Sequence, residues 1–371
     1  MRAVPNDMSS ALSPVVIRFG RLGDTLLLQP LLHKLQQRYG RPCRLLAVGA
    51  WPEDLYDSQP EVSEVITLHA PHRPLLISPE RWRVIRQLRN MREAPIYVCE
   101  PQPRALAKIC RMLALAGIPA DRCVYLTDMP WPGDGHWVDR LLCFGDRTPA
   151  AFCGMYGPLM VDLGAAPQLL VSTAERADCD SWLRKRDLAG KQLVLLQPAN
   201  KRTMRWSGVR HASDDDKCWP VERWAALARN IVTQRPDARV VLCGCPAEAG
   251  YLEEIRAASA HPAVTSAAGE LPLGRLKALM AVAHSMVSVD TGPAHLAAAV
   301  DCPLAVLFGS VPPSQWAPRS ANSKVTILGG PPHSTRVDAI TLEQVMDAWH
   351  GLSVRPVAWR AAAAVTAAAA Y

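Results

Sequence analysis

Short apolar runs and longer segments with apolar residues three and four positions apart alternate along this chain. The run 15–19 is rich in β-branched residues and ends at a glycine, which is typical of a buried strand. The segment 25–39 has leucines at a helical spacing and is closed by Gly40, so it predicts a helix. In the same way we expect strands at 44–48, 65–68 and 96–99 and helices at 80–91 and 104–116. Strands that alternate with helices predict a mostly parallel sheet of the Rossmann-like kind.

The pattern restarts after an irregular stretch, 127–167, which is rich in Pro, Gly and Trp and contains one helical segment at 137–144. Beyond it we expect strands at 193–197, 239–243, 286–289 and 304–308 and helices at 221–233, 246–258, 272–283, 293–300 and 342–352. The fold class is therefore α/β, with two Rossmann-like domains whose parallel sheets we expect to face each other across a cleft. The predicted divisions are a disordered extension at 1–14, a first domain at 15–170, a second domain at 171–335 and a C-terminal segment at 336–371 with an alanine-rich tail.

The composition supports packed domains and an anionic ligand. Of 371 residues, 49% are hydrophobic and 20% are charged, so disorder is not expected for most of the chain. A net charge of +7 and a pI of about 8.9 fit an anionic ligand or an anionic membrane surface. Because the chain has no dense basic tract interleaved with aromatic residues, we do not expect nucleic acid as a partner.

The 11 cysteines are scattered, and no two of them have CxxC spacing. Cys243 and Cys245 lack a histidine or cysteine at metal-ligand spacing, so we expect neither a metal site nor a cofactor. Reduced, buried cysteines are typical of a cytosolic protein, which is the location we expect. The amino-terminal residues carry no apolar signal region and no long apolar run follows, so we expect neither a signal peptide nor a membrane-spanning helix.

Three turns carry candidate chemistry. The first, Gly20-Arg21-Leu22-Gly23-Asp24, follows the first predicted strand, and its glycines allow a ligand to approach the backbone closely. Asp24 is a candidate general base that would take a proton from a hydroxyl. The alternative is that Asp24 only caps the following helix, which aspartate does often.

The second turn is Asp214-Asp215-Asp216-Lys217-Cys218-Trp219-Pro220, and Pro220 is expected at the first position of the next helix. Lys217 would then stand beside a helix N-terminus, and an ammonium group with a helix end makes a strong anion site. The basic segment 201–210 ahead of it is a candidate anion-binding lid. Solvated surface residues are the alternative for both.

The third turn, Asp290-Thr291-Gly292-Pro293-Ala294-His295, joins a predicted buried strand to a predicted helix. The first N–H groups of a helix lack internal partners and lie at the positive end of its dipole, so this turn predicts a phosphate site. The alternative is a structural turn in which Asp290 caps the helix and His295 packs inside it. One glycine-rich turn is a weak signal, whereas three turns at strand ends in two repeated domains favour ligand binding.

With these turns the chain resembles the bacterial lipopolysaccharide heptosyltransferases of glycosyltransferase family 9. The opening strand and turn at 16–24, the lysine motif at 216–224 and the donor-phosphate motif at 290–299 stand in the family's order, and Leu307-Phe308-Gly309 follows. The resemblance runs from about 15 to 352, and the combination of motifs is specific. It implies a GT-B fold with the acceptor in the first domain and an ADP-activated heptose in the second. It also implies that the last helix, 342–352, crosses back to the first domain.

The resemblance further implies an inverting reaction that needs no metal. Asp24 would deprotonate an acceptor hydroxyl, while Lys217 and the N–H groups of Thr291 and Gly292 would stabilise the departing diphosphate. The other implied donor-binding residues are Gln197, Glu248 (on the ribose), Asp290 and His295. The implied acceptor-binding residues are Arg18, Arg21, Gly23 and Arg104, with a surface ion pair as the alternative for each of the three arginines. The implied partners are an ADP-sugar, a lipopolysaccharide core sugar and, peripherally, the inner face of the inner membrane.

Two departures from the family pattern leave the acceptor open. The segment between Gln197 and Lys217 is long, and Glu100-Pro101-Gln102-Pro103-Arg104 replaces the family's glycine-containing acceptor loop. The cysteine spacing of the protein-modifying members is missing, which favours lipopolysaccharide over protein as acceptor. The alternatives are a family-9 transferase with another nucleotide-sugar donor or a protein acceptor, and a catalytically silent nucleotide-sugar-binding protein. A dehydrogenase is disfavoured because the first turn lacks GxGxxG.

Overall fold

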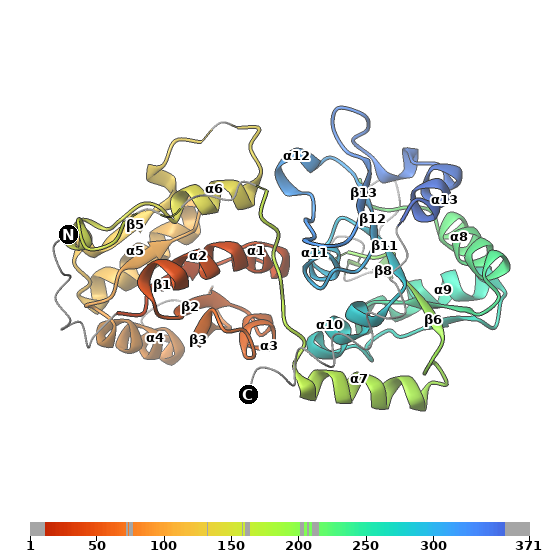
Figure 1. The fold of residues 1–371 in the computed structure, drawn as a ribbon, viewed down its shortest axis with the longest axis horizontal. Helices are drawn as coiled ribbons and strands as arrows, with labels where there is room; N and C mark the ends of the chain where they lie inside the picture. The colour runs from red at the N-terminus through yellow and green to blue at the C-terminus, as the bar shows by residue number, and fades with distance from the viewer. Residues whose placement is uncertain are drawn as a thin grey trace, which may run out of the picture. The chain divides into compact units, whose positions relative to one another are not determined.

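The computed structural model describes residues 12–71, 73, 77–131, 133–157, 159, 164–200, 204–205, 208–209 and 215–352. The chain forms two compact units, residues 1–165 and 166–371, each built on its own parallel sheet (Figure 1). The sequence places the boundary at 170, and the structure places it between Ala165 and Ala166. The predicted extension at 1–14 lies mostly outside the described residues, and the alanine-rich tail lies outside them entirely.

Unit 1 contains a five-stranded parallel sheet in the order β3-β2-β1-β4-β5. Its strands are β1 (Val15–Arg18), β2 (Cys43–Val48), β3 (Val62–Leu68), β4 (Ile96–Val98) and β5 (Cys123–Tyr125). In the central strand β1, Ile17 lies opposite Leu46 of β2 and Val98 of β4. All four residues of β1 are buried, as expected for an apolar strand covered on both faces.

Helices cover both faces of this sheet (Figure 1). On one face α2 (Gln29–Tyr39) packs against α6 (Trp137–Phe144), and α1 (Leu22–Leu26) packs against α3 (Trp51–Tyr56). On the other face α4 (Pro79–Asn90) packs against α5 (Pro103–Ala116). Apolar residues of α4 and α5 form one core with the strands, namely Val84, Ile85, Leu88, Ile109, Met112 and Leu113. The strand order reverses between β1 and β4, and ligands bind at such switch points in parallel sheets.

The prediction of one continuous helix over 25–39 is wrong. The structure has a short α1 that ends at Leu26 and a second helix, α2, that begins at Gln29. Pro30 lies in the first turn of α2 and explains the break. A proline has no N–H to donate, and its ring excludes the carbonyl group four positions earlier, so a helix cannot run through it unbroken. The break makes α1 a separate element, with Asp24 as its third residue.

Unit 2 contains a six-stranded parallel sheet in the order β10-β9-β6-β11-β12-β13. Its strands are β6 (Gln192–Gln197), β9 (Ala238–Leu242), β10 (Val264–Ser266), β11 (Ser285–Val289), β12 (Leu304–Phe308) and β13 (Val325–Gly329). Met286 of β11 lies opposite Leu195 of β6 and Leu304 of β12. The order reverses between β6 and β11, so this sheet has a switch point like that of unit 1. A separate antiparallel pair joins β7 (Met204–Arg205) and β8 (Gly208–Val209).

The helices of unit 2 form two groups (Figure 1). α7 (Thr173–Lys185) packs on α10 (Leu273–Val282), and α10 also contacts α11 (Gly292–Ala299). α8 (Val221–Gln234) packs on α9 (Ala249–Ser259), and α13 (Leu342–His350) packs on α8, β12 and β13. α12 (Pro313–Trp316) is short. The described part of the C-terminal segment therefore belongs to the core of unit 2, and its return to the first domain stays a prediction.

The sequence analysis missed α3, α7, α12, β5, β7, β8, β10 and β13, most of which are short. β5 and β10 have three residues each, which is too short for a periodic signal. α7 buries only Cys179, Trp182 and Leu183, so its apolar stripe is narrow. The other predicted strands and helices are present with shifted ends. Pro220 caps α8 from the position before its first residue rather than occupying that residue.

Candidate functional site

The predicted site residues form one group in each unit, and both groups lie where parallel strands end. In unit 2, Gln197 is the last residue of β6 and Asp290 directly follows β11. In unit 1, Arg18 is the last residue of β1 and Asp24 follows in α1. The structure thus brings each group to the switch point of its own sheet. The proposed lid at 201–210 lies outside the described residues except for its short β7 and β8 strands.

Lys217 lies against the end of β11. Its Nζ donates to the carbonyl oxygen of Asp290 at 3.1 Å and to the carboxylate Oδ2 of the same residue. The two side chains are 12% and 10% exposed, so water screens this ion pair little. Since an ammonium group has three N–H donors, one remains for a further acceptor. Asp290 therefore positions a lysine instead of capping α11, and the capping alternative for Asp290 is wrong.

The backbone around Lys217 is fixed by the neighbouring Asp215. The carboxylate of Asp215 accepts from the Lys217 N–H at 3.1 Å and from Nδ2 of Asn200 at 3.2 Å. Asp215 is 1% exposed. A buried carboxylate bonded to a main-chain N–H holds that backbone in one conformation. The alternative that Lys217 is a solvated surface lysine is therefore wrong.

Asp216 ties the same turn to two distant segments. Its Oδ2 accepts from the N–H of Ser310 at 2.9 Å and from the hydroxyl of Ser310 at 2.6 Å. Its carbonyl oxygen accepts from the N–H of Val337 at 2.8 Å. A Cβ atom on Gly309 would lie 2.6 Å from the Asp216 carbonyl oxygen and 2.7 Å from Oδ2. Only glycine fits at 309 without displacing the lysine turn, which gives the Leu307-Phe308-Gly309 motif a physical reason.

The N-terminus of α11 supplies main-chain donors beside this ion pair. Thr291 is the N-cap residue, and the N–H groups of Thr291 and Gly292 have no hydrogen-bond partner within the described residues. Pro293 has no N–H, so these two groups are the donors that the first turn offers to a ligand. The Thr291 hydroxyl donates to the Val289 carbonyl at 3.2 Å, which directs it into the protein. His295 is buried in the same turn, and its contact with a ligand stays a prediction.

Gln197 and Glu248 lie at the ends of neighbouring strands, β6 and β9. Gln197 is buried, and its Nε2 donates to the carbonyl of Ala199 at 3.0 Å. Glu248 ends a single 3₁₀ turn before α9, and its Oε2 accepts from the Cys245 N–H at 2.8 Å. Burial raises the pKa of Glu248, although the bonds from Cys245 oppose the rise. A Cβ on Gly244 would lie 2.8 Å from Oε2 of Glu248, so the carboxyl group packs closely against the backbone at Gly244.

Asp24 is held by two donors in unit 1. Its Oδ1 accepts from a terminal nitrogen of Arg18 at 2.9 Å, and its Oδ2 accepts from the Arg21 N–H at 2.9 Å. The second bond is part of a capping box, so Asp24 does cap α1. Gly20 leaves the room for this arrangement, because a Cβ there would lie 2.5 Å from the Cβ of Asp24. Capping fixes the carboxylate in place and does not exclude its proposed part in proton transfer.

Arg18 lies between two carboxylates. Besides Asp24, its guanidinium is 3.5 Å from Oε1 of Glu100, and it donates to the Cys99 carbonyl at 3.2 Å. Arg18 is 4% exposed. To bind an acceptor as predicted, the guanidinium of Arg18 would have to give up hydrogen bonds that it makes within the protein. Its observed role is to link the ends of β1 and β4.

Glu100 is the residue of this edge that the sequence analysis missed. It is 1% exposed and accepts from the N–H groups of Phe19 at 3.1 Å and Gln102 at 2.9 Å. Burial raises its pKa, whereas Arg18 and the two N–H groups oppose the rise. Its position directly after a predicted buried strand was the available signal, because that is where ligand-binding residues of such sheets lie.

The other predicted acceptor residues are more exposed. Arg21 is exposed as the N-cap of α1, and Gly23 is half-buried inside that helix. Arg104 is exposed in the first turn of α5. No hydrogen bond or ion pair joins Arg104 to Asp24 in the described part of unit 1. The structure thus places Arg21 and Gly23 directly beside Asp24, whereas Arg104 lies in α5 on the opposite face of the sheet.

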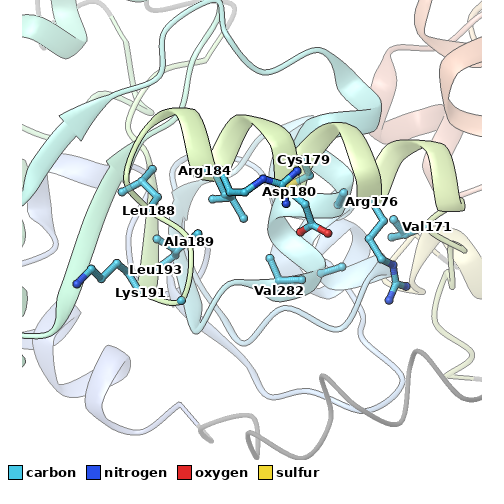
Figure 2. Close-up of a pocket in the computed structure, with 14 residues that line it drawn as sticks. Val171, Arg176, Cys179, Asp180, Arg184, Leu188, Ala189, Lys191, Leu193 and Val282 are labelled. Carbon is cyan, nitrogen blue, oxygen red and sulfur yellow. The ribbon is translucent and has the colours of Figure 1, made fainter.

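A cavity of about 270 Å³ lies elsewhere in unit 2, between α7 and α10 (Figure 2). Its lining includes Leu183, Leu188 and Ala278, and none of the predicted donor residues lines it. Across the described ranges no group of three His, Cys, Asp or Glu residues is placed to hold a metal ion. No helix among the described residues is long and apolar enough to cross a membrane.

Comparison with known proteins gives one consistent family. Residues 192–345 match the model of glycosyltransferase family 9 (heptosyltransferase). A stretch of 155 residues is 31% identical to lipopolysaccharide heptosyltransferase 3 of Escherichia coli and covers 38% of this chain and 40% of that relative. Over 325 residues the chain is 26% identical to lipopolysaccharide heptosyltransferase 2 of Escherichia coli (strain K12), which covers 83% of this chain and 85% of the relative.

The fold is shared with solved structures as well. The chain matches the structure of the E. coli ADP-heptose lipopolysaccharide heptosyltransferase II with a TM-score of 0.69 at 22% identity. This match covers 91% of the present chain and 98% of the other. It confirms the expected GT-B fold class in its two parallel-sheet α/β domains.

Proposed function

The chain is a glycosyltransferase of family 9, and from this membership we propose that it moves a heptose from ADP-heptose to a sugar of the lipopolysaccharide core. Relatives named as lipopolysaccharide heptosyltransferases support the acceptor class. The likeness to the E. coli ADP-heptose lipopolysaccharide heptosyltransferase II supports the donor. The observation that carries the proposal is the Lys217–Asp290 pair beside the open N–H groups of α11.

The donor diphosphate would bind at this edge of unit 2. Its oxygens would accept from the remaining N–H of Lys217 and from the N–H groups of Thr291 and Gly292. Gln197 and Glu248 would contact the nucleoside part, with Glu248 on the ribose hydroxyls. Asp290 would keep Lys217 in place, and His295 would orient the diphosphate from the first turn of α11.

The acceptor hydroxyl would react at the edge of unit 1. Asp24 takes the hydroxyl proton while the acceptor oxygen bonds to the anomeric carbon of the heptose. The bond from that carbon to the diphosphate oxygen breaks on the opposite side, so the configuration inverts and ADP leaves with the bonding electron pair. Lys217 and the two N–H groups stabilise the charge that grows on ADP, which is the role a metal ion has in other transferases. Arg21, Gly23 and Arg104 would line the acceptor.

The remaining proposals concern the setting of the reaction. We place the enzyme in the cytoplasm, at the inner face of the inner membrane, because its acceptor is anchored in that membrane. The net charge of +7 supports contact with an anionic surface.

The deciding experiment follows ADP release. The protein is incubated with ADP-heptose and a heptose-deficient core acceptor, and ADP and the extended acceptor are quantified together. Turnover that persists in excess EDTA is expected. Turnover with another nucleotide sugar but not with ADP-heptose would reassign the donor, and donor binding without any transfer would overturn the proposed activity.

A further inference from the structure

A strongly basic surface lies on α4 and α5 of unit 1, and of its residues only Arg104 has a part in the proposed reaction. α4 carries four arginines against one glutamate, and α5 carries two arginines and one lysine with no acidic residue. Such a charge excess on adjoining helices attracts anionic surfaces. The helices of unit 2 differ, since α8 and α9 together carry arginines and glutamates in equal number.

The cations are arranged in two stripes. On α5, Arg104, Lys108, Arg111 and Leu115 recur at intervals of four, three and four residues, which places them on one helix face. On α4, Trp82, Arg86 and Arg89 recur at intervals of four and three and form a second stripe. We call these seven residues together the α4–α5 surface.

Two hydrogen bonds show that the stripes lie side by side. A terminal nitrogen of Arg89 donates to the Leu115 carbonyl at 3.0 Å, which joins the C-terminal ends of the two helices. Nζ of Lys108 donates to the Pro71 carbonyl at 3.2 Å, which joins α5 to the loop before α4. The two helices therefore run in the same direction and present one continuous face.

This face is open to solvent and mixes cations with apolar side chains. Trp82 is 40% exposed, Leu115 is 37% exposed, and Ile77, just before α4, is 69% exposed. Arg86 and Arg111 are exposed and make no ion pair or side-chain hydrogen bond within the described residues. The nearby acids are occupied, because Glu80 accepts from the N–H groups of His69 and Ala70 and Glu93 pairs with Arg122.

We propose that the α4–α5 surface docks unit 1 onto an anionic phospholipid bilayer. Arginines and lysines bind the negative headgroups, and an exposed tryptophan with neighbouring apolar side chains inserts at the headgroup level. A nucleic acid would match the cations but not Leu115 and Ile77. α4 begins at the sheet edge that carries Asp24, so docking keeps that edge close to the headgroups, where a lipid-anchored acceptor sugar lies. Only this last link rests on the proposed function.

The test uses the full-length protein and vesicles of phosphatidylcholine, with and without phosphatidylglycerol. Cosedimentation is expected only with the anionic vesicles, and added salt should weaken it. The triple variant R86E/R89E/R111E should lower partition onto anionic vesicles by roughly 100-fold. The control R184E/K185E/K191E makes the same change of charge at exposed residues of unit 2 and should bind almost normally. An equal loss in both variants, or no loss in the first, would overturn the proposal.

Two further measurements keep docking separate from the proposed catalysis. Trp82→Ala should remove the part of vesicle binding that survives high salt, and circular dichroism should show that each variant is folded. Transfer to a water-soluble, delipidated acceptor should be unchanged in R86E/R89E/R111E. If the parent protein performs no transfer, the proposed function fails while the vesicle result still decides the surface. Tight binding to duplex RNA without vesicle binding would assign the surface to a different partner and refute docking.

Discussion

At the edge of unit 1, one buried arginine is shared by two carboxylates, whereas at the edge of unit 2 one lysine is held by one carboxylate next to a helix N-terminus. Both edges lie at switch points of similar parallel sheets. In the first, two carboxylates share one buried guanidinium, an arrangement that suits a group that accepts a proton. The second offers N–H donors and suits a group that binds an anion. The comparison shows that the fold provides the position, while a few side chains at strand ends decide the chemistry.

The largest expected effect comes from a substitution that changes only the unit 1 edge. Asp24→Asn keeps the size of the side chain and an acceptor for the Arg21 N–H, but it removes the proposed base. We expect the turnover number to fall roughly 10³-fold, while the dissociation constant for ADP-heptose changes little. Stopped-flow or coupled ADP assays with calorimetric donor binding check both. Normal turnover in the variant would remove Asp24 as the base.

The next largest effect comes from a substitution that changes only the unit 2 edge. Lys217→Met keeps the length of the side chain and removes its charge, so both donor affinity and turnover should fall, turnover by about 100-fold. The exposed Lys185→Met on α7 is the matched control and should be unaffected. A variant at 217 with unchanged kinetics would contradict the phosphate role, and a loss of affinity without a loss of turnover would limit Lys217 to binding.

A smaller effect tests whether the lysine turn depends on its supports. Gly309→Ala places a Cβ 2.6 Å from the Asp216 carbonyl oxygen, so the turn must shift. We expect kcat/KM to fall about tenfold and the free energy of unfolding to fall by about 1–3 kcal/mol. Gly250→Ala in α9, where an added Cβ meets nothing within 4 Å, is the control and should be neutral or slightly stabilising. Equal behaviour of the two variants would show that Asp216 does not support the site.

The smallest expected effect concerns Glu100 at the unit 1 edge and the pH dependence of the free energy of unfolding. Burial raises the pKa of Glu100 above its ordinary value of 4.5, so the folded protein holds this proton more tightly than the unfolded chain does. The protonated carboxyl group therefore adds to the free energy of unfolding at low pH. This contribution is lost as the pH rises from 4.5 through the raised pKa of the folded protein. Glu100→Gln cannot ionise and should lack this fall in denaturant titrations across that range. Because Glu100 reaches Asp24 only through Arg18, turnover should change by about tenfold or less.

Sequence periodicity predicted the two α/β units well because buried parallel strands and their helices have strong apolar patterns. It failed where local chemistry overrides the pattern, as at Pro30, and where elements are short or half-exposed, as in β10 and β13. The motifs indicated Asp24, Lys217 and Asp290, and the structure joins the last two in an ion pair.

The supports of the site could not be predicted from the sequence. The bond from Ser310 to Asp216 joins residues 94 positions apart, and the bond from Phe19 to Glu100 joins residues 81 positions apart. The pattern of a single sequence does not reveal such long-range bonds, because the bonds form only when separate strands end at the same edge of the sheet. The sequence accordingly indicates Glu100 only as part of a loop that departs from the family.

The segment just before α13 has a consequence for how much of the chain the enzyme needs. The Val337 N–H bonds to the Asp216 carbonyl, and the Ile340 carbonyl accepts from the indole of Trp219 and from Arg223. A protein shortened after β13 would keep every strand of its second sheet, yet the loop that presents Lys217 would lose its brace. Such a truncation would also take Val345, Met346 and Trp349 out of the core of unit 2, so it should lower the stability of that unit together with its capacity to hold a nucleotide sugar. The carboxyl-terminal stretch thus has two roles: it braces the loop that presents Lys217, and it completes the core on which that loop rests.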